Sequence, residues 1–197
     1  ATGVLPVCFG EATKFSQFLL DADKRYRSTF VLGEKTATGD AEGEVLETLS
    51  AAHVTEAEVL KAIQALTGEI DQVPPMYSAL KQNGQPLYKL ARQGIEVERK
   101  ARQVTIYEFE LLAFRPGERA EIDVDVKCSK GTYIRSLAED IGEALECGGH
   151  VSALRRTATG PFDESQCVTV DELNAERGDG LSELLDHHLL PTDTPVA

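Results

Sequence analysis

The sequence predicts an α+β fold, with a mixed, mainly antiparallel sheet and flanking helices. Strand patterns on both sides of Pro116-Gly117 indicate an antiparallel hairpin, because that dipeptide favours a tight turn. The helical patterns do not alternate regularly with strands, as they do in doubly wound folds. The length of 197 residues, 42% of them hydrophobic, is sufficient for one domain that buries its own core.

The N-terminal region predicts one helix and one strand. Residues 11–20 place Phe15, Phe18 and Leu19 at helical spacing, which is typical of a short amphipathic helix. Residues 24–33 are rich in β-branched and aromatic side chains and end at a glycine, which indicates a strand.

A second helix is expected over residues 55–67. Thr55 and Glu58 fit a capping box, in which each side chain binds the backbone N–H of the other residue. Gly68 follows as a natural stop for the helix. The preceding residues 35–43 are polar and contain two glycines, so we expect a turn there.

Strands resume at residues 104–114 and 119–128. In the second of these strands, apolar residues at 122, 124 and 126 alternate with charged residues at 123, 125 and 127. One face of the strand is therefore expected to be buried and the other to face water.

The last third of the chain predicts further helices and one strand. A helix is expected from Thr132, as its N-cap, to Gly148, followed by a strand over residues 150–159. Two short helices are expected at residues 169–180 and 181–191.

The net charge of −13 argues against a nucleic-acid partner, but the charge is distributed unevenly. Residues 77–107, called the basic segment below, contain six basic residues and two acidic ones. Residues 34–71 and 161–197 each contain nine acidic residues and at most two basic ones. The basic segment fits either RNA binding or a solvated surface, and Tyr77 and Tyr88 within it are able to stack on bases.

Composition excludes several other classes of protein. No apolar run approaches the roughly 20 residues of a membrane span, and the first ten residues lack the basic start of a secretory signal. The four cysteines have no paired spacing, which indicates free thiols in a reducing cytoplasm. The four histidines form no ligand pattern, so no metal site is expected. Because no apolar run is long enough for a membrane span, no membrane partner is expected either.

The first of three motifs that suit nucleotide binding lies at residues 24–27. On a strand, Tyr26 points to the face opposite Arg25 and Arg27. If the tyrosine face lines a cleft, these arginines and Lys24 lie near phosphates at its rim. A core tyrosine beside exposed charges fits the same pattern.

The second motif, residues 130–137, places Tyr133 and Arg135 in the first turn of a helix, just after Lys130. An arginine there opposes the positive end of the helix dipole, so we expect it to face a carboxylate or a phosphate. An ordinary surface arginine is the alternative.

The third motif lies at residues 150–162, where Leu154 precedes Arg155 and Arg156. A buried leucine beside arginines that reach phosphates suits a nucleotide cleft. An edge strand with exposed arginines fits the same residues.

Together, and in this order, the motifs resemble the TruB family of bacterial tRNA pseudouridine synthases. The resemblance runs along essentially the whole chain and includes ATGVLPVCFGEATKFSQFLLDADKRYR, KTATGDAEG, PPMYSALKQNGQPLYKLARQGIEV, CSKGTYIRSLAEDIGEALECGGHVSALRR and LLPTDTPVA. It implies the pseudouridine synthase catalytic-domain fold and isomerisation of the T-loop uridine at tRNA position 55. It further implies the tRNA T arm as the partner, no cofactor, and a monomer.

The resemblance also sets expectations for the domains. The family's nucleophilic aspartate would lie three residues before Ala1, since residues 1–5 match the end of its motif. Residues 1–197 are thus expected to be the catalytic domain without its N-terminal part, and the family's C-terminal RNA-binding domain, of the PUA type, is expected to be absent. The basic segment, residues 77–107, would be an insertion that closes over the RNA arm.

Roles for individual residues follow from the same resemblance. Tyr26 would stack on the flipped uracil and assist removal of the C5 proton, and Arg135 would pair with the nucleophilic aspartate. Tyr133 and Leu154 would complete the uracil pocket. The cations expected to bind RNA are Lys24, Arg25, Arg27, Lys81, Lys89, Arg92, Lys100, Lys130, Arg155 and Arg156.

Two other functions stay open. Taken by itself, the chain is expected to be a non-catalytic module that binds the T arm, because the nucleophile lies outside it. Alternatively, Asp40 or Asp140 supplies the carboxylate and the chain is active alone.

Overall fold

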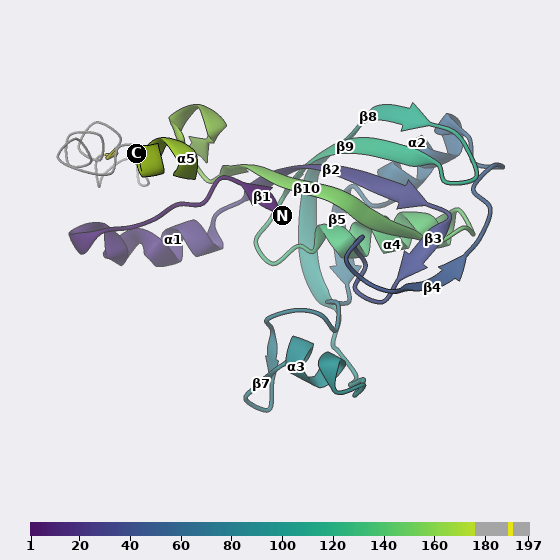
Figure 1. Cartoon of the computed structure of the whole chain (residues 1–197), viewed down its shortest axis with the longest axis horizontal. Helices are drawn as coiled ribbons and strands as arrows, with labels where there is room; N and C mark the ends of the chain where they lie inside the picture. The colour runs from purple at the N-terminus through teal and green to yellow at the C-terminus, as the bar shows by residue number, and fades with distance from the viewer. Residues whose placement is uncertain (176–188, 191–197) are drawn as a thin grey trace.

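A seven-stranded mixed sheet organises the chain, as the computed structural model of residues 1–175 and 189–190 shows (Figure 1). The strand order is β1-β10-β2-β9-β8-β5, with β11 pairing to β10. Among the strands of the described residues, only β1 runs parallel to its neighbour, which confirms the predicted α+β class with a mainly antiparallel sheet. The strands are β1 (Thr2–Gly3), β2 (Lys24–Leu32), β5 (Gly68–Gln72), β8 (Arg102–Arg115), β9 (Glu121–Cys128), β10 (Gly149–Thr159) and β11 (Phe162–Asp163).

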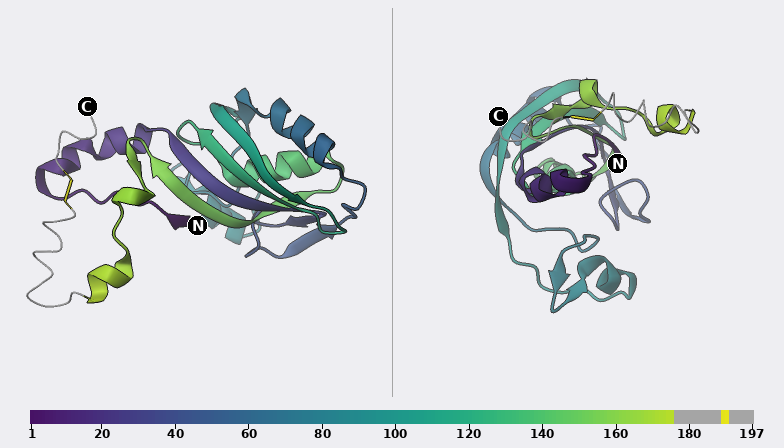
Figure 2. Two further views of the ribbon diagram at one scale, coloured as in Figure 1. Left: turned by 90° about the horizontal axis from the view of Figure 1, so that it is seen from above. Right: turned by 90° about the vertical axis from the view of Figure 1, so that its left-hand side faces the viewer.

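Helices and two small hairpins complete the fold. Helices α2 and α4 pack against each other and against the same sheet, α2 on β8 and α4 on β10 and β2 (Figure 2). The helices are α1 (Ser16–Asp21), α2 (Glu56–Ala65), α3 (Leu87–Arg92), α4 (Ile134–Ala144) and α5 (Val170–Ala175), with 3-10 turns at Gly10–Phe15 and Glu164–Gln166. Two small hairpins pair β3 (Glu34–Thr36) with β4 (Val45–Thr48) and β6 (Lys81–Gln82) with β7 (Gln85–Pro86).

The capping box predicted for α2 is confirmed. The Glu58 backbone N–H donates to the Thr55 hydroxyl at 3.4 Å, and the Thr55 N–H donates to the Glu58 carboxylate at 2.9 Å. The helix ends at Ala65, two residues earlier than expected, and Gly68, with a φ of +102°, begins the edge strand β5. That strand has a single strongly apolar residue, Ile70, so its sequence lacks the alternation that identifies a strand.

The core lies between the sheet and the two helices. Phe30 of β2, Ile122 and Val124 of β9, and Leu137 and Ile141 of α4 are fully buried. The buried face predicted for residues 122, 124 and 126 is therefore confirmed, and so is the hairpin of β8 and β9.

Asp125 departs from the water-facing side predicted for β9. Only 6% of the residue is exposed. The Arg25 Nε lies 2.6 Å from its carboxylate and the Arg27 Nε 3.6 Å from it. The two arginines of β2 cover the carboxylate, and sequence alternation cannot show such cross-strand partners.

Two helix starts differ from the predictions. The 3-10 turn and α1 replace the single helix expected over residues 11–20, and Leu19 is buried there while Phe18 is 44% exposed. Helix α4 begins at Ile134 with Tyr133 as N-cap, because the Thr132 hydroxyl donates instead to the Ser129 carbonyl at 2.9 Å. Of the two predicted terminal helices, α5 covers part of the first, and most of the second lies outside the described residues.

Gly142 allows α4 to approach the turn before β10. A Cβ at this position would lie 2.2 Å from the Gly148 carbonyl carbon and 2.3 Å from the Gly149 nitrogen. We expect Gly142→Ala to lower the free energy of unfolding by about 3 kcal/mol, since backbone on both sides has to move. Urea unfolding measures this, with the exposed Glu143→Ala on the same helix as the control. A loss as small as that of the control would contradict the prediction.

Candidate functional site

A cleft of about 660 Å³ opens on the helix side of the sheet, where β1, β2 and β10 meet the start of α4. Four residues assigned to the site by sequence, Tyr26, Tyr133, Arg135 and Leu154, all line this cleft. They come from three elements that lie far apart in the sequence. The lining is completed by residues 1–5, the loop at 40–42, Thr132 and Ile134 at the start of α4, and Val151, Ser152 and Arg156 of β10.

Strand pairing positions the floor of the cleft. Tyr26 lies opposite Arg156 in the register of β2 and β10. The Val4 N–H donates to the Arg156 carbonyl at 2.8 Å, and the Arg156 Nε donates to the Val4 carbonyl at 2.8 Å. Gly3 permits this approach, because a Cβ there would lie 2.0 Å from the Arg156 oxygen. Arg156 thus anchors the N-terminal segment against β10.

Tyr26 is half-buried and packs against the core with its ring. Burial raises the pKa of its hydroxyl, an effect that the nearby Arg156 opposes. The phenol therefore stays neutral at physiological pH. A neutral aromatic ring with one polar end is suited to stack on a base and to donate or accept a hydrogen bond.

Arg135 lies in the first turn of α4 and binds two separate segments. Its Nη1 donates to the Thr38 carbonyl at 2.8 Å, and its Nη2 donates to the Tyr77 carbonyl at 2.6 Å. Asp40 Oδ2 lies 3.9 Å from Nη1. The expectation that this arginine faces a carboxylate is thus met by Asp40 within the described residues, and a pairing with an aspartate before Ala1 stays a prediction.

Asp40 reaches the cleft because its loop is fixed to β10. The Val151 N–H donates to the Gly39 carbonyl at 3.0 Å, and the Ala41 N–H donates to the Val151 carbonyl at 2.9 Å. The Thr38 hydroxyl donates to the Asp40 carboxylate at 2.6 Å. The sequence named Asp40 only as an alternative carboxylate, because these backbone contacts leave no side-chain signal.

The cations at residues 24–27 are not among the residues that line the cleft. The Lys24 ammonium donates to the Leu19, Leu20 and Ala22 carbonyls at 2.5–3.1 Å, and burial lowers its pKa. Arg25 and Arg27 lie on the opposite sheet face from Tyr26 and bind Asp125. The structure thus gives all three intramolecular partners, and their contact with RNA stays a prediction.

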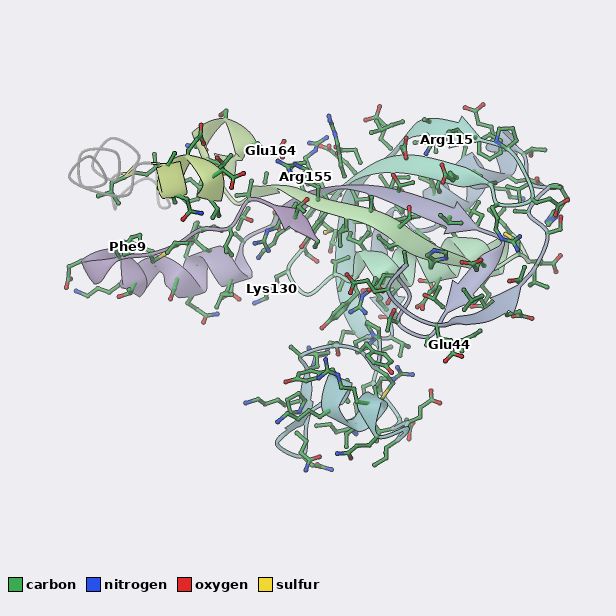
Figure 3. The ribbon with its side chains drawn as sticks, in the orientation of Figure 1. Phe9, Glu44, Arg115, Lys130, Arg155 and Glu164 are labelled. Atoms are coloured by element: carbon green, nitrogen blue, oxygen red, sulfur yellow. The ribbon has the colours of Figure 1, made fainter. Side chains whose placement is uncertain are left out.

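Two further predicted cations also form ion pairs. Arg155 binds Glu164 on the turn after β11, and Figure 3 places these two side chains together. Lys130 lies 2.7 Å from Asp21 at the end of α1. Exposed pairs of this kind contribute little to stability, so phosphates are able to compete for either cation.

Residues 77–101 of the basic segment extend away from the sheet and carry the β6–β7 hairpin and α3, whereas residues 102–107 form the start of β8 (Figures 1 and 2). Lys81, Lys89 and Lys100 are exposed on it. The Arg92 guanidinium lies 5.3 Å from the centre of the Tyr88 ring. A second cavity, of about 420 Å³, is lined by Tyr77 and Arg99 of the basic segment together with Thr38 and Glu139.

Asp140, the other alternative carboxylate, lies outside the cleft lining. Burial and, to a lesser degree, Glu143 raise the pKa of Asp140. The folded state thus binds the proton more tightly, and ionisation of this carboxyl costs stability as the pH rises through its ordinary pKa.

We therefore expect Asp140→Asn to raise the Tm at pH 7 but to leave it unchanged near pH 3, where the carboxyl is protonated in both states. Thermal unfolding at the two pH values measures this, and the exposed Asp71→Asn on β5 is the matched control. An equal change of Tm at both pH values would contradict the assignment.

The described residues contain no group of three or more histidine, cysteine or acidic side chains placed to bind a metal ion. Within the same part of the chain, no helix has the length and apolar character that a bilayer crossing requires.

Comparison with known proteins identifies the family of the chain. The profile of the TruB family pseudouridylate synthase N-terminal domain matches residues 1–134, and that of the tRNA pseudouridylate synthase B C-terminal domain matches residues 135–197. The two matched segments share one sheet, since β10 pairs with β2.

Curated relatives are similar over the whole chain. The chain is 72% identical over 197 residues to tRNA pseudouridine synthase B of Saccharophagus degradans, covering all of this chain and 63% of that protein. It is 59% identical over 194 residues to the protein of the same name from Ectopseudomonas mendocina, covering 98% of this chain and 62% of that one. The chain thus spans somewhat less than two thirds of the length of these relatives.

Solved structures share the fold. A Cbf5-Nop10-Gar1 complex contains a chain that is 31% identical, with a TM-score of 0.71, over 98% of this chain and 49% of the other. An H/ACA RNP bound to a substrate RNA containing 2'-deoxyuridine gives 28% identity and a TM-score of 0.68, over 98% of this chain and 48% of the other. By its sequence and its fold, the chain belongs to the TruB family of pseudouridylate synthases.

Proposed function

We propose that the protein isomerises the T-loop uridine at position 55 of tRNA to pseudouridine. The observation that supports this most strongly is the cleft, which collects Tyr26, Tyr133, Arg135 and Leu154 from three separated elements. Family membership supplies the reaction class. The relatives' names specify tRNA, and we extend that substrate to this chain.

The proposed chemistry needs a uridine that has left the base stack. A base inside a folded arm is inaccessible, so the enzyme flips it into the cleft. There Tyr26 stacks on the uracil and assists removal of the C5 proton, while Tyr133 and Leu154 contact its edges. The C1′–N1 bond breaks, the base rotates, and a C1′–C5 bond forms. C5 loses a proton and N1 gains one, so the step is an isomerisation that consumes no co-reactant.

Arg135 would orient and keep ionised a nucleophilic carboxylate. Ala1 lines the cleft. An aspartate three residues before Ala1 would lie within about 10 Å of Ala1, because three extended residues span no more than that. The carboxylate would thus enter the cleft from the end where β1 begins.

The basic segment would close over the RNA arm. Lys81, Lys89, Arg92 and Lys100 would contact phosphates there, and Lys130, Arg155 and Arg156 would contact them nearer the cleft. The chemistry needs no cofactor, and we propose a monomer that acts in the cytoplasm, where tRNA is processed.

Pseudouridine formation on an unmodified tRNA transcript tests the proposal. The chain with its native flanking sequence is expected to give product at the T-loop uridine. The 197-residue chain is expected to bind the transcript without product. Product from the 197-residue chain would assign the nucleophile to Asp40, whose carboxylate lies 3.9 Å from Arg135 in the cleft. Binding without product in both proteins would contradict the proposed activity and favour a T-arm binding module.

A further inference from the structure

Gln72, the last residue of β5, is a buried polar residue that the proposed chemistry does not use. It is 3% exposed. Its Nε2 donates to the Tyr133 carbonyl at 3.1 Å, and its Oε1 accepts from the Tyr133 N–H at 2.8 Å. Both ends of the side-chain amide therefore bind the backbone of one cleft residue.

This contact gives a hydrogen-bond partner to the Tyr133 N–H, which the helix itself leaves unpaired. Tyr133 is the N-cap of the helix, has an extended backbone (φ −101°, ψ 111°), and makes no side-chain cap. The Gln72 side-chain amide pairs with both the N–H and the C=O of Tyr133, as the backbone of a neighbouring strand would. Because the Gln72 side chain is buried against the Tyr133 backbone, its removal leaves the Tyr133 N–H without this hydrogen-bond partner.

The residues after Gln72 continue along the first turn of α4. The Ser136 hydroxyl donates to the Val73 carbonyl at 3.4 Å, and Arg135 donates to the Tyr77 carbonyl at 2.6 Å. The chain at 72–77 thus joins the start of α4 at three points and then enters the basic segment. If Gln72 moves, the backbone of Tyr133 and the side chain of Arg135 are therefore expected to move with it.

We infer that Gln72 is a positioning residue, which fixes the Tyr133 backbone and, through the helix start, the Arg135 guanidinium in the cleft. This inference rests on the proposed function for its catalytic consequence. Misplacement of reacting or orienting groups by about 1 Å is able to cost 100-fold in rate. Gln72 touches no substrate atom in this scheme, so its removal should affect turnover rather than tRNA binding.

Two variants with native flanking sequence test the inference. Gln72→Met keeps the length but removes both hydrogen bonds, and Gln72→Glu keeps the acceptor but sets a carboxylate against the Tyr133 carbonyl. We expect kcat to fall 10- to 100-fold in both, with KM for tRNA changed less than twofold. Val59→Ala, in the core on α2, serves as a destabilised reference that is expected to keep kcat. An unchanged kcat in both glutamine variants, or an equal loss in Val59→Ala, would overturn the inference.

Hydrogen exchange of the Tyr133 amide provides a readout that does not depend on activity. In Gln72→Met this amide should lose protection at least tenfold, while amides in the middle of α4 keep theirs. Unchanged protection at Tyr133 would overturn the inference. If the unaltered protein makes no pseudouridine, the proposed function fails, but the exchange result still decides whether Gln72 holds Tyr133.

Discussion

Arg135→Ala is expected to lower kcat for pseudouridine formation at least 100-fold, with the Kd for tRNA changed less than threefold. The guanidinium joins the Thr38 and Tyr77 carbonyls and lies 3.9 Å from Asp40 at the cleft. Removing one preorganised polar group from an active site costs about 100- to 1,000-fold in kcat. Arg135→Lys should have an intermediate effect, because an ammonium cannot span both carbonyls with the same geometry. Single-turnover assays on a tRNA transcript measure the change.

Arg119, between β8 and β9 and outside the cleft lining, provides a matched control. Its Nη1 donates to the Leu49 and Glu118 carbonyls at 3.0 and 2.9 Å, and its Nε lies 3.6 Å from Glu34. Arg119→Ala thus removes a similar set of contacts without touching the cleft, and kcat should stay within twofold. Equal losses in the two variants at similar Tm would mean that Arg135 acts only on the fold.

Much of the fold could be predicted from the sequence, because its signals are local. The Thr55 and Glu58 capping box and the alternation along β9 depend on residues within a few positions of each other. Strand β5 could not be predicted, since its place at the sheet edge depends on pairing with β8, 30 to 38 residues later. Its sequence has little apolar pattern of its own.

The site was predicted in part, and the reason lies in distance along the chain. Tyr26, Tyr133, Arg135 and Leu154 were assigned through a family resemblance, and the structure brings all four to one cleft. The ion pair of Arg25 with Asp125 joins residues 100 positions apart, which no local pattern reveals.

Backbone partners also escape sequence reasoning. The Thr38 and Tyr77 carbonyls bind Arg135 whatever their side chains are. The contribution of Gln72 is similar, because a glutamine two residues before a pair of prolines carries no local signal for a contact with residue 133.

Replacing Lys81, Arg92 and Lys100 by alanine is expected to weaken tRNA binding at least tenfold at low salt. The salt dependence should fall as well, because removing one cation from a phosphate reduces the slope of log K against log[salt] by about 0.7 to 0.9. Lys81 and Lys100 are exposed, and Arg92 contacts only the neighbouring Tyr88 ring among the described interactions, so their replacement leaves the core intact. Filter binding or fluorescence titration at several salt concentrations measures both quantities.

A second triple variant separates local binding of phosphates from overall charge. Lys14, Lys35 and Lys61 are exposed and lie outside the basic segment, so their replacement by alanine removes the same three charges. Long-range attraction depends on net charge, which is already −13 and falls equally in both variants. Direct binding of phosphates to the basic segment is removed only in the first variant. Equal weakening and equal slopes in the two variants would therefore place the RNA away from the basic segment, whereas a larger change in the first would place phosphates against it.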